Sequence, residues 1–301
     1  MRYDEAYRYG GKRLEEAGIS EAKLDAGLLL EYVCGTDRNT LLAHPEREVE
    51  SEEEKSYVNC IEKREKRIPL QHITGTQNFM GLDFYVNQNV LIPRQDTEIL
   101  VEEVMLHLHD GMSILDLCTG SGCILISLLQ YSNDCAGVGT DFSGEALKLA
   151  VKNAESILEQ KGIKVLTENA VPVNNEVHFV CGDLFAPLDE AAAETEIKFD
   201  ILVSNPPYIP TEVISTLEPE VAAHEPFMAL DGREDGLFFY RKIIAGAGKY
   251  LNRGGKLFFE IGYDQGEAVS RLLEEAGFVD IEIKKDYAGL NRVVFGTFLE
   301  D

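Results

Sequence analysis

From residue 113 to the end of the chain, short apolar runs typical of strands alternate with segments of helical periodicity. The strand-like runs are 113–117, 136–140, 177–181, 200–204 and 255–261, with two closing runs near 278–285 and 292–298. Such alternation predicts a parallel sheet covered by helices on both faces. On such sheets, ligands bind beyond the carboxyl ends of the strands, near the point where the strand order reverses. We therefore expect functional residues at these strand ends.

The region before this sheet is predicted to form a separate helical domain. Apolar residues recur at helical spacing over 3–17 and 20–34. Gly18 and Gly35 follow at positions where helix C-termini favour a residue that tolerates left-handed dihedrals. This region contains no glycine-rich loop or polar cluster with an evident chemical role, so we expect it to position a partner rather than to react with one.

A third helix is expected over about 51–67. Ser51 and Glu54 resemble a capping box that opens it, and Pro69 prevents its continuation. The run 63–67 (KREKR) is the only concentration of basic residues in this region. We interpret it as a solvated helix face, with contact to an RNA or protein partner as the alternative.

Between about 70 and 92 the apolar period shifts towards two, which predicts a hairpin that joins the two domains. Gly81 and the stretch 87–89 (NQN) suit its turns. A helix of about 95–109 follows, with carboxylates in its first turn. The predicted domains are 1–78 (helical), 79–92 (hairpin linker) and 93–301 (α/β).

The first strand of the sheet leads directly into a tight loop headed by Asp116. Its residues are Cys118, Thr119, Gly120, Ser121 and Gly122. Glycines here let the backbone turn and approach a ligand closely. A dinucleotide fingerprint needs a third small residue where this chain has Leu125, and no phosphate-binding G-x-x-x-x-G-K-[ST] loop occurs. The loop therefore favours a cationic or hydroxylated ligand over a pyrophosphate.

The next two strand ends suit an adenosine group. Asp141 can accept both hydroxyls of a ribose, although it could equally cap the helix that follows. Asp183 can accept from an exocyclic amino group, and Leu184 offers an apolar edge to a flat ring. Together with the acidic loop these features favour S-adenosylmethionine, whose methionine end carries an ammonium group.

The fourth strand ends in the most specific signal of the chain, Asn205-Pro206-Pro207-Tyr208. Two prolines remove two amide donors and fix the directions of neighbouring carbonyl groups. The Asn205 side-chain oxygen and the Pro206 carbonyl could engage both hydrogens of an sp² amino group. Its nitrogen would then face the methyl donor and stack against Tyr208.

These motifs resemble those of the bacterial N(5)-glutamine methyltransferases of peptide chain release factors. The matching stretches are IPRQDTE at 92–98, ILDLCTGSG at 114–122, GDLF at 182–185, FDILVSNPPY at 199–208, LEPEV at 217–221, EP at 225–226, EIGYDQG at 260–266 and DYAGL at 286–290. The resemblance covers about residues 60–301, and the helical N-terminal region agrees in type and length.

The resemblance implies a class I methyltransferase, with a Rossmann-like seven-stranded sheet and a small N-terminal substrate-recognition domain. It implies methylation of the glutamine in the Gly-Gly-Gln motif of class I release factors, with S-adenosylmethionine as donor. By the same resemblance, Cys118–Gly122, Asp141 and Asn205 contact the donor, and Asn205, Pro206, Pro207 and Tyr208 hold the glutamine amide. We expect Asn205, Pro206 and Tyr208 to be catalytic.

The chain departs from the family pattern at three places. Cys118 stands where many members have glycine. A cysteine should serve at this position if only a backbone contact is needed and φ is not positive. Gln95-Asp96 replaces the more usual Pro-Glu. The stretch 161–176 resembles a surface insertion. Separately, the segment 209–235 is too long for a simple connection, so we expect it to line a groove for the protein substrate.

Two other functions are compatible with the motifs. An N(6)-adenine or N(2)-guanine methyltransferase could use the same turn, but it needs a basic track for phosphates. The chain instead has 53 acidic residues against 28 Lys and Arg, a formal charge of −25, which disfavours nucleic-acid partners. A silent donor-binding scaffold would be expected to lack Asn205 or the glycine loop, and both are present.

The compartment predicted from the sequence is the cytoplasm. The first residues are too charged for a signal peptide, and no run approaches the ~18 apolar residues that a membrane span needs. The six cysteines show no C-x-x-C pair and no metal-ligand spacing, so we expect reduced thiols and no metal.

Overall fold

The computed structural model of the protein describes residues 1–168, 173–191 and 196–299. The chain forms two compact units, one of Met1–Thr76 with Leu217–His224, the other of Gln77–Thr216 with Glu225–Asp301. Each unit has a buried core of its own. The predicted domain limits remain predictions, and no local sequence feature indicates that Leu217–His224 joins the first unit.

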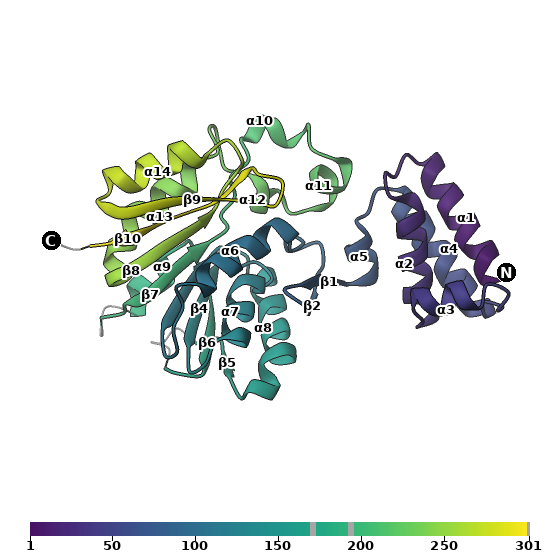
Figure 1. Ribbon diagram of the computed structural model, residues 1–301, viewed down its shortest axis with the longest axis horizontal. Helices are drawn as coiled ribbons and strands as arrows, with labels where there is room; N and C mark the ends of the chain where they lie inside the picture. Colours follow the sequence, from purple (N-terminus) through teal and green to yellow (C-terminus); the bar gives the residue numbers. More distant parts are fainter. Residues whose placement is uncertain (169–172, 192–195, 300–301) are drawn as a thin grey trace. The chain divides into compact units, whose positions relative to one another are not determined.

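The first unit is helical. Its helices are α1 (Tyr3–Glu16), α2 (Ala22–Cys34), α3 (Arg38–Ala43), α4 (Ser51–Glu65), α5 (Leu70–Thr74) and α11 (Pro219–His224) (Figure 1). Gly35 ends α2 with a φ of 55°, and Gly18 follows α1 with a φ of 74°, which confirms the left-handed conformation expected of both. Leu14, Leu29 and Tyr57 are fully buried in the core that α1, α2 and α4 share.

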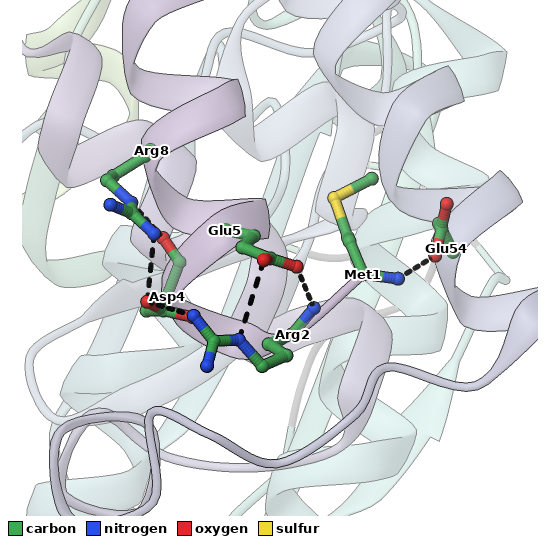
Figure 2. A network of polar contacts seen from close by, with 6 residues as sticks. All are labelled: Met1, Arg2, Asp4, Glu5, Arg8 and Glu54. Atoms are coloured by element: carbon green, nitrogen blue, oxygen red, sulfur yellow. Dashed lines mark hydrogen bonds and ion pairs between the residues drawn. The ribbon is translucent and has the colours of Figure 1, made fainter.

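Helix α4 begins with a different cap from the one predicted. Glu50 is its N-cap, and the Glu53 carboxylate accepts the Glu50 backbone N–H at 3.1 Å. The capping box is therefore made by Glu50 and Glu53, one residue before the predicted pair Ser51 and Glu54. Glu54 instead pairs with the terminal ammonium group of Met1 (Figure 2).

The first turn of α1 carries two carboxylates where the helix dipole is positive. Glu5 accepts the backbone N–H of Arg2 at 2.9 Å, and Asp4 pairs with Arg8 at 2.9 Å (Figure 2). The contact from Arg2 satisfies one backbone donor before the helix hydrogen bonds begin. Because these groups are largely solvent-exposed, a pair such as Asp4–Arg8 contributes about 0.3–0.5 kcal/mol.

The prediction that the basic run 63–67 forms a solvated helix face does not hold for Arg64, which is buried. Its Nε donates to Asp25 at 2.7 Å, and its second terminal nitrogen donates to Glu220 at 2.9 Å. Arg67 lies 3.5 Å from the same Glu220 carboxylate. Two carboxylates therefore face two guanidinium groups inside the first unit, and the bond from Arg64 to Glu220 joins α4 to α11, which lies far away in the sequence.

The predicted hairpin is present but occupies earlier residues than 79–92. Its strands are β1 (Thr76–Phe79) and β2 (Leu82–Tyr85). Met80 and Gly81 form the turn, and both have positive φ, 52° and 74°, as two-residue hairpin turns require. Phe79 and Phe84 are buried in the core of the second unit, so the hairpin packs there, and the stretch 87–89 forms a separate turn.

The second unit is built on a mainly parallel sheet, as predicted. Its strands are β3 (Ser113–Leu117), β4 (Ala136–Asp141), β5 (Lys164–Leu166), β6 (Glu176–Cys181), β7 (Phe199–Ser204), β8 (Leu251–Glu260), β9 (Phe278–Lys285) and β10 (Asn291–Phe298). Their order is β5-β6-β4-β3-β7-β8-β10-β9, with only β10 antiparallel to its neighbours. The strand order reverses between β3 and β7.

The sheet has one more strand than the seven predicted. Lys164–Leu166, inside the supposed insertion 161–176, pairs in parallel with β6 at the sheet edge. The prediction of a surface loop is therefore wrong for these three residues, while 169–172 lie outside the described residues. Three residues are too few to show an alternating pattern in the sequence.

Helices cover both faces of the sheet (Figure 1). The helices of this unit are α6 (Gln95–Met105), α7 (Cys123–Tyr131), α8 (Gly144–Leu158), α9 (Ala186–Ala191), α10 (Thr211–Ile214), α12 (Phe227–Leu230), α13 (Phe238–Tyr250) and α14 (Gly266–Glu275). Alternate strand residues divide between two cores: Val203 packs with α6, α7 and α8, whereas Leu202 packs with α9, α13 and α14. Helix α6 ends at Met105, before the predicted 109.

We predict that Arg64→Ala lowers the free energy of unfolding by about 3–5 kcal/mol, because it leaves the buried Asp25 carboxylate without a counter-charge. Urea unfolding of the full chain, followed by circular dichroism, measures this. The matched control is Arg8→Ala, which removes an exposed pair and should change stability by less than about 1 kcal/mol. Equal effects of the two substitutions would contradict the prediction.

Candidate active site

The register of the sheet brings the predicted site residues to one edge. Leu117 lies opposite Thr140 of β4 and Ser204 of β7, and Asp141 lies opposite Cys181 of β6. Four strands therefore end side by side around the point where the strand order reverses. The loops that follow them are those that the sequence analysis singled out.

The loop after β3 is fixed by backbone contacts to β4 and by its own turns. The Thr119 backbone N–H donates to the Thr140 carbonyl at 3.0 Å, which extends the parallel pairing by one step. The Thr119 hydroxyl donates to Asp116 at 2.6 Å, and the Gly120 N–H donates to Asp141 at 2.9 Å. Burial raises the pKa of Asp116 to about 7. The loop is held before any ligand enters.

Positive φ angles occur at three positions of this loop: 62° at Cys118, 56° at Gly120 and 80° at Gly122. The condition stated for Cys118, a φ that is not positive, is therefore not met, because the turn needs a left-handed residue there whatever its side chain. At Gly122 a Cβ would also lie 2.7 Å from Cδ1 of Ile126. Gly122 thus serves close packing at the start of α7.

The Asp141 carboxylate accepts hydrogen bonds from two backbone N–H groups. Its Oδ2 accepts from Gly120 and its Oδ1 accepts from the Ser143 N–H at 2.8 Å. Burial raises its pKa. Helix α8 itself is capped by Ser143, whose side chain accepts from Ala146, so Asp141 ties the loop after β3 to the turn before that helix.

A cavity of about 380 Å³ lies at these strand ends. It brings together most of the predicted residues: Cys118, Thr119, Gly120, Ser121, Asp141, Asp183, Leu184, Asn205 and Pro207. Gly122, Pro206 and Tyr208 do not line it. Asp183 shares the cavity wall with Lys242, at 3.4 Å from its ammonium group.

Three side chains from other elements form hydrogen bonds with the Asn-Pro-Pro-Tyr turn. Asn205 Nδ2 donates to the Thr97 hydroxyl oxygen at 3.4 Å, and the Tyr208 hydroxyl donates to Glu260 at 3.3 Å. Gln265 donates to the Tyr208 carbonyl at 3.0 Å. Gly236, with a φ of 73°, lets the following loop approach, since a Cβ there would lie 2.3 Å from the Tyr208 carbonyl oxygen.

Several cavity residues were missed by the sequence analysis. Phe142 lines the cavity, and 68% of its surface is exposed. Its position directly after Asp141 in the sequence could have indicated that it lies at the site. Phe227 and Met228, also about half exposed, line it from the segment 209–235, which was expected to line a groove although these two residues were not singled out. Arg94, which pairs with buried Glu225, lines it from the residue before α6.

No group of three or more His, Cys, Asp or Glu side chains could hold a metal ion within 1–168, 173–191 and 196–299. In the same described ranges, no helix is both long and apolar enough to span a bilayer. The six cysteines are all free, with Cys118 and Cys123 at the cavity wall.

Known proteins are similar to this chain over nearly its whole length. Residues 5–75 match a family model described as the PrmC N-terminal domain. A release factor glutamine methyltransferase of Caulobacter vibrioides is 39% identical over 95% of this chain and 92% of its own length. One of Clostridium acetobutylicum is 42% identical over 91% of this chain and 90% of its own.

The solved structures that are similar to this chain include methyltransferases. A SAM-dependent methyltransferase of Streptococcus mutans aligns with a TM-score of 0.50 at 12% identity, covering 74% of this chain and 55% of that one. At this identity the likeness concerns the fold alone. The expected class I methyltransferase fold is confirmed.

We predict that Cys118→Val lowers the free energy of unfolding by about 1–3 kcal/mol, because a β-branched residue is strained at a φ of 62°. Cys118→Gly should stay within about 1 kcal/mol of the native chain, since relief of strain offsets the lost side-chain packing. The control is Cys123→Val, in the first turn of α7. Urea unfolding compares the three, and an equal loss from valine at 118 and 123 would contradict the prediction.

Proposed function

Because this chain belongs to the family of release factor glutamine methyltransferases, we propose that it methylates the side-chain amide nitrogen of a glutamine in peptide chain release factors, with S-adenosylmethionine as donor. The acceptor we propose is the glutamine of the Gly-Gly-Gln motif in class I release factors. The main support is that Asn205 and Pro207 line the same cavity as Gly120 and Asp141, so an amide at the turn would lie beside a donor.

The residues of the cavity fit S-adenosylmethionine. Its volume of about 380 Å³ lies within the usual range for small-molecule sites, about 300–1,000 Å³. Acidic groups at Asp141 and Asp183, an exposed ring at Phe142 and the apolar Leu184 match the ribose, the exocyclic amine and the flat base of an adenosine group. When bound, the donor supplies an electrophilic methyl group on a sulfonium.

Asp141 can serve the ribose while it keeps its two backbone contacts. An ionised carboxylate has about four acceptor positions, and the N–H groups of Gly120 and Ser143 occupy two of them. The remaining positions can accept two ribose hydroxyls. The two interpretations of Asp141, as a structural acceptor and as a ribose ligand, are therefore compatible.

The turn at 205–208 has to activate a weak nucleophile, because the lone pair of a carboxamide nitrogen is delocalised. We propose that Asn205 Oδ1 and the Pro206 carbonyl each accept one N–H of the glutamine amide. These bonds orient the nitrogen towards the methyl group and favour its pyramidal form. Alignment of this kind can supply roughly 7–11 kcal/mol in favourable cases.

No general base is required before the methyl group moves. A bound donor would supply its methyl group to the amide nitrogen and leave as the neutral thioether S-adenosylhomocysteine, and the acidic proton then on that nitrogen would pass to water. The ionisable group nearest the turn in the hydrogen-bond network, Glu260, already accepts from the Tyr208 hydroxyl. We therefore assign these residues to orientation rather than to proton abstraction.

We predict that Asn205→Ala lowers kcat about 100-fold or more, since it removes an acceptor that acts on the transition state. The measurement is the initial rate of labelled methyl transfer to a class I release factor. The control is Asn252→Ala. The Asn252 amide donates to Asp200 at 2.8 Å and does not line the cavity, so this variant should retain kcat. Near-native turnover of Asn205→Ala would refute the role of this residue.

The function itself is tested by mass spectrometry of the release factor after incubation with the protein and donor. We expect a gain of one methyl group on the glutamine of the Gly-Gly-Gln peptide. RNA and DNA are offered in parallel reactions, and neither should be labelled. Methylation of a nucleic acid but not of the release factor would overturn the proposed function.

A further inference from the structure

Gln265 is a buried residue of the stretch 260–266 and has no part in the proposed reaction. It stands at the N-cap of α14, is 8% exposed and does not line the cavity. Its side-chain oxygen accepts from the Gly262 backbone N–H at 2.9 Å. Its amino group donates to the backbone carbonyls of Tyr208 at 3.0 Å and Gly236 at 3.3 Å. One buried amide therefore joins three separate stretches of backbone.

The partners of Gln265 decide which way its amide points. A backbone N–H can only donate a hydrogen bond, and a backbone carbonyl can only accept one. The N–H of Gly262 therefore requires the side-chain oxygen, and the two carbonyls require the amino group. The reverse orientation would place oxygen against oxygen at both Tyr208 and Gly236. The direction of this amide thus follows from the backbone and depends on no protonation state.

The backbone of Gln265 is itself fixed to the sheet and to α14. Its N–H donates to the Gly262 carbonyl at 2.9 Å, and its carbonyl accepts from the Val269 N–H at 3.0 Å. Directly after β8, the Ile261 N–H donates to the Arg292 carbonyl of β10 at 2.9 Å. The side chain therefore extends from a turn that is anchored at both ends.

The two carbonyls lie on either side of the segment 209–235, with Tyr208 directly before it and Gly236 directly after it. Near these ends, the Gly232 N–H donates to the Ile209 carbonyl at 2.8 Å. The amide that joins the two carbonyls therefore closes the base of this segment.

The Asn-Pro-Pro-Tyr turn has little rotational freedom of its own. The rings of Pro206 and Pro207 fix φ at about −65°, and Asn205 directly follows the last residue of β7. The bond from Gln265 holds the other end of the turn at the Tyr208 carbonyl. Rotation of the Pro206 carbonyl then requires that this bond breaks or that the strand moves. This carbonyl is one of the two proposed hydrogen-bond acceptors for the glutamine amide.

We propose that Gln265 is a positioning residue for methyl transfer: by holding the Tyr208 carbonyl, it fixes the directions of the oxygens that the turn presents to the acceptor amide. This inference rests on the proposed function. Gln265 acts through the backbone, because its side chain does not line the cavity. Its contribution is alignment, and a displacement of about 1 Å at a reacting group can lower the rate about 100-fold.

The first test replaces the Gln265 amide by a thioether of similar length. Gln265→Met removes both bonds to the carbonyls, so we expect kcat to fall about 10- to 100-fold because the turn is no longer held in alignment. The measurement is the initial rate of labelled methyl transfer from S-adenosylmethionine to a class I release factor, with the full-length protein. Unfolding in urea checks that the variant is folded when it is assayed.

A second variant gives a readout that packing alone would not change. In Gln265→Glu, an ionised carboxylate can accept from Gly262 but has no proton for the carbonyls of Tyr208 and Gly236. Burial and these carbonyl oxygens favour the neutral form of such a group, which can again donate to a carbonyl. The ratio of its kcat to the native kcat should therefore rise about fivefold or more as the pH falls from about 8 to about 5.5. The same ratio for Gln265→Met should stay constant.

The group that titrates in this comparison is the introduced carboxyl. Tyr240 of α13 also lies against Gln265, with its hydroxyl 3.4 Å from Oε1. Burial raises the pKa of Tyr240 well above its usual range, so this hydroxyl stays protonated throughout. Asp264 and Glu267, the acidic neighbours of Gln265 in the sequence, are exposed and are the same in every variant.

The matched control is Asn252→Asp, which makes the same change from amide to carboxylate opposite an oxygen. The Asn252 amide donates to Asp200 at 2.8 Å and does not line the cavity. This variant should retain kcat, and its ratio to the native kcat should not rise as the pH falls.

The outcomes distinguish this inference from the proposed function. If the native protein does not methylate the release factor, the proposed function fails. If the native protein is active and Gln265→Met keeps its kcat, the positioning inference alone is overturned. It is also overturned if Gln265→Met and Gln265→Glu lose the same share of activity at every pH, because the amide then serves only packing.

Discussion

The parallel register of β3 with β4 and β7 is the constraint on which the rest of the site depends. Side chains alternate between the two faces of a sheet, so a slip of one residue would turn every buried side chain of a strand to the opposite face. The register places Leu117 opposite Thr140 and Ser204. The pairing continues into the loop through Thr119. The register therefore sets the positions of the strand-end residues that line one side of the cavity.

The polar groups of the cavity are oriented by the protein before any ligand arrives. Asp141 is held by two backbone donors, and the Asn-Pro-Pro-Tyr turn is held through Thr97, Glu260 and Gln265. Fixed dipoles of this kind favour a transition state because they need no reorganisation when the reaction occurs. The burial of Glu260 has a second effect, since the hydrogen bond that it accepts from Tyr208 is electrostatically stronger in a medium of low polarity than in water.

The sequence predicted the features that depend on local pattern, and it missed those that depend on distant contacts. Strands such as β3 and β9 coincide with the predicted runs, and the family motifs located Gly120, Asp141 and Asn205 at one cavity. The three-residue strand β5 lacked a period long enough to detect. The pairing of Thr97 with Asn205, which are 108 positions apart, has no local signal at all. The sequence left the sign of φ at Cys118 open, because cysteine rarely adopts the left-handed conformation that it has in this loop.

Buried Arg64 holds a segment that interrupts the second unit in the sequence, and the chain that follows this segment leads to residues of the cavity wall. Leu217–His224 is held in the first unit by Glu220, whereas the residues on either side of it belong to the second unit. Pro226 and Phe227, which line the cavity, follow this segment almost directly. A long loop anchored at its middle has shorter free stretches and therefore less conformational entropy to lose when a substrate orders it. Glu220 makes this anchoring possible, because its carboxylate accepts a hydrogen bond from Arg64 and also pairs with Arg67.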